Sequence, residues 1–209
     1  RRDPSLTRIF HIGLDIGQRV DHSALCLIEV EGERSIVRVL VKYPLGTGYP
    51  LLTKTVAELY KSVAQMGDVY SFNVDATGVG AAPAAMLQEL LADVRINPFI
   101  FTNKSKRELV GKVKVMHAFG KLKFAMRKGD EVYNRTLSEL MTEMKQLQAK
   151  VIREDASNPE IEVFKTGQHD DLFTALALAV KDVYYTAMSE GLVTFIEDKT
   201  WTKTPLEER

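Results

Sequence analysis

The sequence predicts an α/β domain with a mixed central sheet, antiparallel in its first three strands and then parallel, flanked by helices on both faces. Strand-like segments at residues 9–17, 23–30 and 35–43 are separated by short turns, so consecutive strands pair antiparallel. From residue 51 onward, helical and strand-like segments alternate, which is typical of a parallel sheet covered by helices. A length of 209 residues suits one such domain with a core of its own.

The first strand-like segment alternates between apolar residues and nearly bare positions. Its apolar face consists of Phe10, Ile12, Leu14 and Ile16. Its other face consists of Gly13, Asp15 and Gly17. An acid inside an apolar strand rarely lacks a partner or a purpose, so Asp15 is the first candidate for a functional residue.

The remaining elements are predicted from their periodicity and their boundary residues. Helices are expected at residues 51–66, 81–91, 105–122 and 170–188, and strands at 69–75 and 96–101. Residues 133–150 are expected to form a helix, or a helix that merges into a strand, and residues 151–165 an extended hairpin with its tip near 157–159. The domain is expected to span residues 9–190, between an N-terminal tail (1–8) and a C-terminal tail (191–209).

Composition and charge narrow the class of protein. Hydrophobic residues make up 45% of the chain and charged residues 27%, as in ordinary soluble proteins, and no apolar run approaches the roughly 20 residues of a membrane span. A formal net charge of zero argues against coating nucleic acid through bulk electrostatics. The lone Cys26 fits a reducing compartment. Because there is no initiator Met, the chain is expected to be a fragment with a partner domain upstream.

Acidic residues occupy three places that converge if the two strands are neighbours. Asp15 lies in the first strand, Asp75 ends the strand at 69–75, and Asp170 and Asp171 begin the last helix. Grouped carboxylates raise one another's pKa, and divalent cations remove this penalty. Such ligands suit Mg²⁺ or Mn²⁺, and two ions about 3.5–4 Å apart can activate a water and stabilise a leaving oxygen.

Ordinary structural roles compete with metal binding at these positions. An aspartate at a strand end, such as Asp75, often forms a turn. Asp170 is a good N-cap, and acids are favourable in the first turn of a helix. Neighbouring helical residues point about 100° apart, so one of the pair can cap while the other binds metal. We favour Asp171 as the ligand and keep Asp170 as a close alternative.

Three motifs occur in a set order along residues 9–188. They are Gly13-Leu-Asp-Ile-Gly17 with Asp21-His-Ser-Ala24, then Val74-Asp-Ala-Thr-Gly-Val-Gly80, then His169-Asp-Asp-Leu172 leading into Ala175–Ala179. Each motif is weak alone, but the ordered set resembles the nuclease domain of tailed-bacteriophage large terminase subunits, which has an RNase H-like fold. The resemblance implies that Asp15, Asp75 and Asp171 bind the catalytic metals, with Asp170 adjoining and Asp21 as an accessory acid.

The same resemblance implies an endonuclease that hydrolyses concatemeric double-stranded DNA during viral DNA packaging, with two Mg²⁺ or Mn²⁺ ions and little sequence specificity. It implies an upstream ATPase domain, a portal and a small terminase subunit as partners, no membrane, and the cytoplasm of the infected bacterial host as the location. No Gly-x-x-x-x-Gly-Lys-[Ser/Thr] segment occurs in the sequence, so no P-loop is expected to bind ATP here.

Basic residues gather at the predicted helix that begins near residue 105. Lys104, Lys106 and Arg107, with Lys112 beyond them, are predicted to contact the DNA backbone, or else form an ordinary solvated helix end. His169 is expected to orient a water or touch the scissile phosphate, or else to be a capping or surface residue. Gly78 and Gly80 are expected to serve close backbone packing rather than nucleotide binding.

Three rival classes share some of these features. Actin-like ATPases and sugar kinases also begin with Gly-x-Asp-x-Gly, but they need two copies of the fold and a basic first loop, where this chain has Gln18–Asp21. A Holliday-junction resolvase shares fold, metals and reaction, and a preference for branched DNA would distinguish it. A docking domain that has lost its chemistry is disfavoured because all the acids are present.

Overall fold

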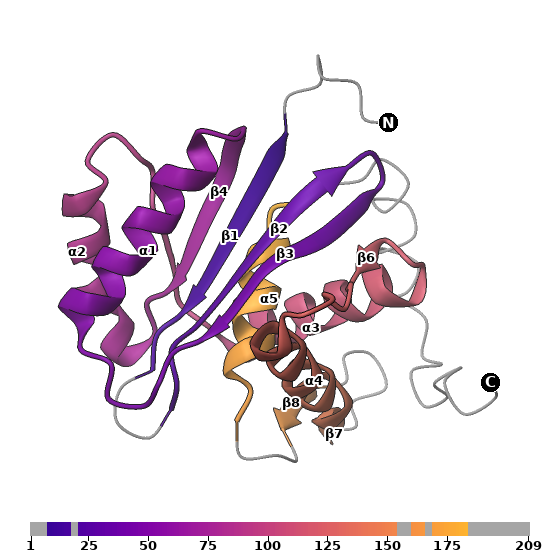
Figure 1. The fold of residues 1–209 in the computed structure, drawn as a ribbon. Helices are drawn as coiled ribbons and strands as arrows, with labels where there is room; N and C mark the ends of the chain where they lie inside the picture. The colour runs from indigo at the N-terminus through magenta and orange to yellow at the C-terminus, as the bar shows by residue number, and fades with distance from the viewer. Residues whose placement is uncertain (1–7, 18–20, 154–159, 166–168, 184–209) are drawn as a thin grey trace.

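The computed structural model describes residues 8–17, 21–153, 160–165 and 169–183, and these form a sheet with helices on both faces (Figure 1). The main sheet has the strand order β5-β4-β1-β2-β3-β6. Its strands are β1 (Ile9–Asp15), β2 (Ala24–Glu31), β3 (Arg34–Lys42), β4 (Asp68–Asp75), β5 (Asn97–Phe99) and β6 (Leu122–Lys123). The β1–β2 and β2–β3 pairs are antiparallel, and the β1–β4, β4–β5 and β3–β6 pairs are parallel. The predicted mixed sheet is confirmed.

One face of the sheet is covered by two helices, α1 (Tyr49–Ala64) and α2 (Ala81–Leu90). The alternating pattern of β1 is confirmed, because Phe10, Ile12 and Leu14 are buried on this face, in one cluster with the apolar side chains of both helices. A short 3₁₀ turn, Gly78–Gly80, joins β4 to α2. Pro83 is buried within the first turn of α2, where its missing N–H does no harm.

The opposite face carries α3 (Asn103–Ala118), α4 (Glu131–Gln146) and α5 (Asp171–Val180). Helix α5 lies in the middle, in contact with β1 and β2 on one side and with α3 and α4 on the other. Its residues from Leu172 to Val180 are buried on every side except at Thr174, and are not confined to one apolar stripe. A helix that is apolar all round is a core helix, so α5 is the centre of this half of the core.

Helix α5 lies directly against the backbone of β1. A Cβ atom placed on Gly13 would lie 2.0 Å from the carbonyl oxygen of Ala175 and 2.4 Å from the backbone nitrogen of Ala179. Both atoms belong to the helix backbone, which cannot move aside as a flexible side chain can. The bare face of β1 noted in the sequence is therefore the surface on which α5 rests.

Several predicted boundaries needed correction. Helix α5 ends at Val180, not at residue 188, and the residues after 183 lie outside the described part of the chain, as do both predicted tails apart from residue 8. Its end is fixed by side chains, because Asn73 Nδ2 donates to the Leu178 carbonyl (2.9 Å) and Lys112 Nζ to that of Lys181 (2.7 Å). Helix α3 ends at Ala118, since Gly120 adopts a φ of 63° that terminates helices.

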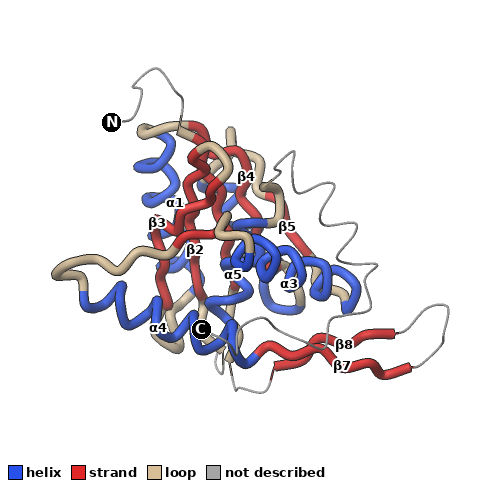
Figure 2. The backbone as a smooth tube through the Cα atoms, turned by 90° about the vertical axis from the view of Figure 1, so that its right-hand side faces the viewer, coloured by secondary structure: helices blue, strands red, loops and turns tan. Residues whose placement is uncertain are grey.

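The segment after α4 forms a separate hairpin. Strands β7 (Leu147–Arg153) and β8 (Glu160–Lys165) pair antiparallel and extend away from the main sheet (Figure 2). This confirms the prediction of a helix that merges into a strand, while the predicted tip at residues 157–159 lies outside the described residues. None of the helices in the described part of the chain combines the length and apolar character needed to cross a membrane.

Candidate metal centre

Asp15 and Asp75 lie side by side where two adjacent parallel strands end. Leu14 and Val74 are partners in the β1–β4 register, so the next residue of each strand is an aspartate at the same edge. Asp75 lies close enough to Asp15 for its charge to raise the pKa of the Asp15 carboxyl. Asp75 Oδ1 also accepts a hydrogen bond from the backbone N–H of Thr77 at 2.7 Å. Asp75 therefore forms the turn after β4 and at the same time faces Asp15.

Asp170 and Asp171 bring two more carboxylates from the start of α5. Asp171 is nearly buried, and its Oδ2 accepts a hydrogen bond from the His22 backbone N–H at 3.3 Å. Asp170 Oδ2 lies 2.9 Å from Lys106 Nζ. The central position of α5 thus brings its N-terminus to the edge of the sheet where β1 and β4 end.

The electrostatics of Asp15 reflect this crowding. Burial raises its pKa well above the usual range, and the negative charges of Asp75, Asp171 and Asp170 raise it further. The pKa of Asp171 is also raised, mainly by burial. Carboxylates that repel one another in a partly desolvated site are stabilised by a bound cation. The donor set, all carboxylate oxygens, fits a hard divalent cation such as Mg²⁺ or Mn²⁺.

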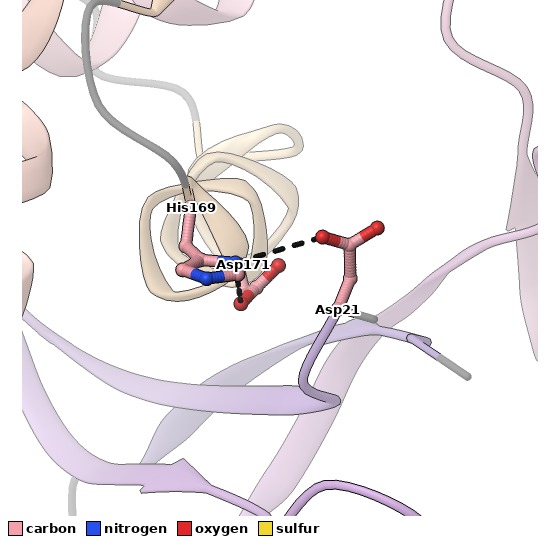
Figure 3. Close-up of side chains that lie close together, drawn as sticks. All are labelled: Asp21, His169 and Asp171. Carbon is pink, nitrogen blue, oxygen red and sulfur yellow. Dashed lines mark ion pairs between the residues drawn. The ribbon is translucent and has the colours of Figure 1, made fainter. Parts of the chain in front are cut away.

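A second group of side chains adjoins these carboxylates. Ligand atoms of Asp21, His169 and Asp171 all lie within 4.8 Å of one another (Figure 3). His169 Nδ1 is 3.6 Å from Asp21 Oδ1 and 3.8 Å from Asp171 Oδ2. This nitrogen is buried and has no hydrogen-bond partner among the described residues. The predicted accessory residues Asp21 and His169 therefore lie together, with Asp171 as the residue shared between the two groups.

The N-terminus of α5 is capped in a way that the sequence did not indicate. Asp170 is the residue before the helix, but its side chain makes no capping hydrogen bond. The acceptor is Glu143 of α4, whose Oε2 receives the backbone N–H of Phe173 at 2.8 Å. Burial is the main cause that raises the pKa of Glu143, to about 7. The expectation that one of the two aspartates caps the helix is wrong, because Glu143 supplies the cap. The assignment of Asp171 as a metal ligand, with Asp170 as the alternative, stays a prediction.

The predicted basic residues do not all lie together. Lys104 is exposed and Arg107 half-buried in the first turns of α3, and Lys106 of the same helix contacts Asp170 directly. Lys112 contacts the other end of α5, where burial lowers its pKa to about 8. That end is about 15 Å away along the ten-residue helix. The structure thus places Lys106 against Asp170 and Lys112 at the opposite end of α5.

An open groove adjoins the acids on the α4 side. Its volume is about 370 Å³, and its lining includes Lys42, Arg135, Thr142, Glu143 and His169. Lys42 lies at the end of β3 and its Nζ is 3.0 Å from a carboxylate oxygen of Glu139. Neither cation of this groove was selected from the sequence, because both are isolated charges in segments with no basic cluster.

Two glycines allow the loops around the acids to approach closely. A Cβ on Gly80 would lie 1.9 Å from the Asp75 carbonyl oxygen, and one on Gly17 would lie 2.1 Å from that of Asp21. Gly78 has a φ of 61°, which favours glycine. The interpretation of Gly80 as a packing residue is confirmed, whereas that of Gly78 is wrong: a Cβ at Gly78 would meet nothing within 4 Å, and its backbone conformation is what favours glycine.

Comparison with solved structures shows which fold this is. The large terminase nuclease of thermophilic phage G20c aligns with 85% of this chain and 83% of its own, with a TM-score of 0.59 and 20% identity. The Mn-soaked human cytomegalovirus terminase nuclease domain aligns with 86% of each chain (TM-score 0.56, 10% identity). The large terminase of another thermophilic bacteriophage aligns with 88% of this chain and 42% of its own (TM-score 0.59, 10% identity).

Comparison by sequence finds no match, in contrast to comparison by structure. No family model matches the chain, and no curated protein matches it significantly. The structural matches confirm the predicted RNase H-like fold shared with terminase nuclease domains.

Proposed function

We propose that this chain is a metal-dependent endonuclease that hydrolyses double-stranded DNA, and that it serves as the nuclease domain of a viral large terminase subunit. The observation that carries the proposal is the convergence of Asp15, Asp75, Asp170 and Asp171 at one edge of the sheet. The similar G20c nuclease has been solved with bound magnesium, and the cytomegalovirus nuclease domain was soaked with manganese. An actin-like ATPase is not favoured, since the similar structures are terminase nucleases.

Each carboxylate of the site has its own role in this proposal. Asp15, the most crowded acid, lies among Asp75 and the acids at the start of α5, so Asp15, Asp75 and Asp171 would together hold the cations. Two bound cations would supply an activated water and stabilise the leaving oxygen of the phosphodiester. Asp21 and His169 would hold a water or a phosphate oxygen at the edge of the centre. Asp170 would exchange its contact with Lys106 for a contact with metal.

The DNA is proposed to contact the centre from both sides. Lys104, Lys106 and Arg107 at the start of α3 would contact phosphates on one side, and Lys42 and Arg135 in the groove would contact them on the other. These are contacts to the backbone, which position a duplex without reading its sequence. The ATPase, the portal and the small subunit are proposed partners of the complete protein.

The direct test is cleavage of supercoiled plasmid. With Mn²⁺ or Mg²⁺ we expect nicked and then linear DNA, and with excess EDTA intact plasmid, because the carboxylates need cations to act on phosphate. Fragment ends should be spread along the plasmid, since the expected contacts are to phosphates. Full cleavage in chelator would contradict the metal mechanism. Cleavage only of four-way junctions would favour the resolvase alternative.

The salt dependence of DNA binding tests the basic residues. Lys104→Ala and Arg107→Ala should each lower the slope of log affinity against log salt by about 0.9 if each side chain neutralises one phosphate. Binding to a random-sequence duplex can be followed by fluorescence anisotropy in EDTA, which prevents cleavage. Lys54→Ala is the matched control, because Lys54 is exposed on α1, across the sheet from the acids. Unchanged slopes in both α3 variants would exclude these contacts.

A further inference from the structure

Glu143 contacts the helix that carries two of the acids. Helix α5 begins at Asp171, so Phe173 is its third residue, and its N–H is one of those that a helix leaves without an internal partner. The residue before a helix usually supplies the acceptor. Here the acceptor is Glu143, from another helix and 30 residues away in the sequence. Glu143 is 6% exposed, and the 2.8 Å hydrogen bond directs its carboxyl group at the α5 backbone.

This arrangement leaves both aspartates of α5 available to the metal centre. A residue whose side chain caps a helix turns that side chain back toward the helix backbone. Because Glu143 provides the cap, Asp170 can instead reach Lys106, and Asp171 can face the His22 N–H and His169. The direction of both carboxylates therefore depends on an acceptor that lies outside their own segment.

We propose that Glu143 is a positioning residue of the metal centre: it holds the first turn of α5 so that the Asp170 and Asp171 carboxylates face Asp15. The proposal rests on the proposed function. Partners that orient metal ligands typically change metal affinity or activity 10–100-fold when they are removed. The role needs an oxygen that accepts a hydrogen bond from the Phe173 N–H, and it does not need a negative charge.

Three variants of the full chain separate positioning from other roles. Glu143→Gln keeps an acceptor oxygen and removes the charge, whereas Glu143→Met keeps the approximate volume and removes the acceptor. Asp130→Ala is the matched control. Asp130 caps α4 by the same chemistry, accepting the backbone N–H of that helix's third residue, Tyr133, at 3.0 Å. It lies at the N-terminus of α4, more than three turns from Glu143.

The measurements are Mn²⁺ binding by calorimetry without DNA, the Mn²⁺ concentration that half-saturates plasmid cleavage, and the melting temperature in EDTA. Glu143→Met should weaken Mn²⁺ binding and raise the half-saturating concentration by about 10–100-fold, and Glu143→Gln should stay within about threefold of the parent chain. Glu143→Met and Asp130→Ala should both lower the melting temperature by about 2–6 °C. Asp130→Ala should leave Mn²⁺ affinity unchanged.

Other outcomes would overturn the proposal. A loss in Glu143→Gln as large as in Glu143→Met would make the carboxylate itself a metal ligand. Unchanged Mn²⁺ affinity in Glu143→Met, or an equal loss in Asp130→Ala, would reduce Glu143 to an ordinary helix cap. If Glu143→Met does not fold, Glu143→Ala, which also removes the acceptor, takes its place in each of these comparisons. A parent chain that binds Mn²⁺ but leaves DNA intact overturns the nuclease and not the role of Glu143, whereas one that binds no Mn²⁺ overturns both.

Discussion

Replacing Asp15 with asparagine should abolish most Mn²⁺-dependent cleavage while the fold survives. Asparagine keeps the size of the side chain but removes the charge that would bind the cations between Asp75 and α5. Bound cations supply several kcal/mol of transition-state stabilisation, and each ~1.4 kcal/mol is a factor of ten, so the rate should fall by about three orders of magnitude. A plasmid assay with a fixed Mn²⁺ concentration measures this loss.

The same variant should be more stable than the parent chain without metal at neutral pH. The folded-state pKa of Asp15 is raised, so folding binds a proton, and the stability of the metal-free protein falls as pH rises from the unfolded-state pKa toward the folded one. Asp15→Asn removes this dependence, and its advantage in melting temperature should grow from pH 4 upward in EDTA. Asp68 lies at the exposed far end of β4. Asp68→Asn should therefore change neither Mn²⁺-dependent cleavage nor the dependence of the melting temperature on pH. Full cleavage by Asp15→Asn would refute the assigned role.

Gly13→Ala should be the most destabilising single substitution of a small residue in the sheet. The added Cβ would lie 2.0 Å from the Ala175 oxygen, so α5 would have to move off β1. We expect a loss of about 3 kcal/mol or more in the free energy of unfolding, at or beyond the upper end of overpacking costs. Urea denaturation followed by circular dichroism measures it.

Gly111→Ala is the matched control for this prediction. Gly111 lies inside α3, and a Cβ there would meet nothing within 4 Å. Alanine is a better helix residue than glycine, so this variant should gain about 0.5–1 kcal/mol. Equal effects of the two substitutions would mean that the close approach of β1 and α5 does not limit stability.

The sequence was sufficient to locate the strand acids because their signals are local. The alternation along β1 places Asp15 on the bare face, and Asp75 ends the strand that became its parallel neighbour. The pairing of two strands, once assumed, then brings the acids together. The apolar residues on every side of α5 also indicate a buried helix.

The contacts around α5 could not be predicted from the sequence, because they depend on how the helices pack against one another. Glu143 meets Phe173 only because α4 crosses the start of α5, and no local motif marks that contact. Lys112 was grouped with Lys106 by sequence distance. Six helical residues amount to about 9 Å along the axis and about 120° of rotation, so the two lysines reach opposite ends of α5.

The contact between Gly13 and α5 also determines how accurately the carboxylates are placed. Asp15 follows Gly13 by two residues on β1, and Asp171 precedes Ala175 by four on α5, so one backbone contact fixes the spacing of acids from two distant segments. Misplacing catalytic groups by about 1 Å can cost about 10²-fold in rate. The small residues beneath α5 therefore serve both the core and the proposed metal centre: a substitution among them is expected to lower the proposed DNA cleavage without changing any acid.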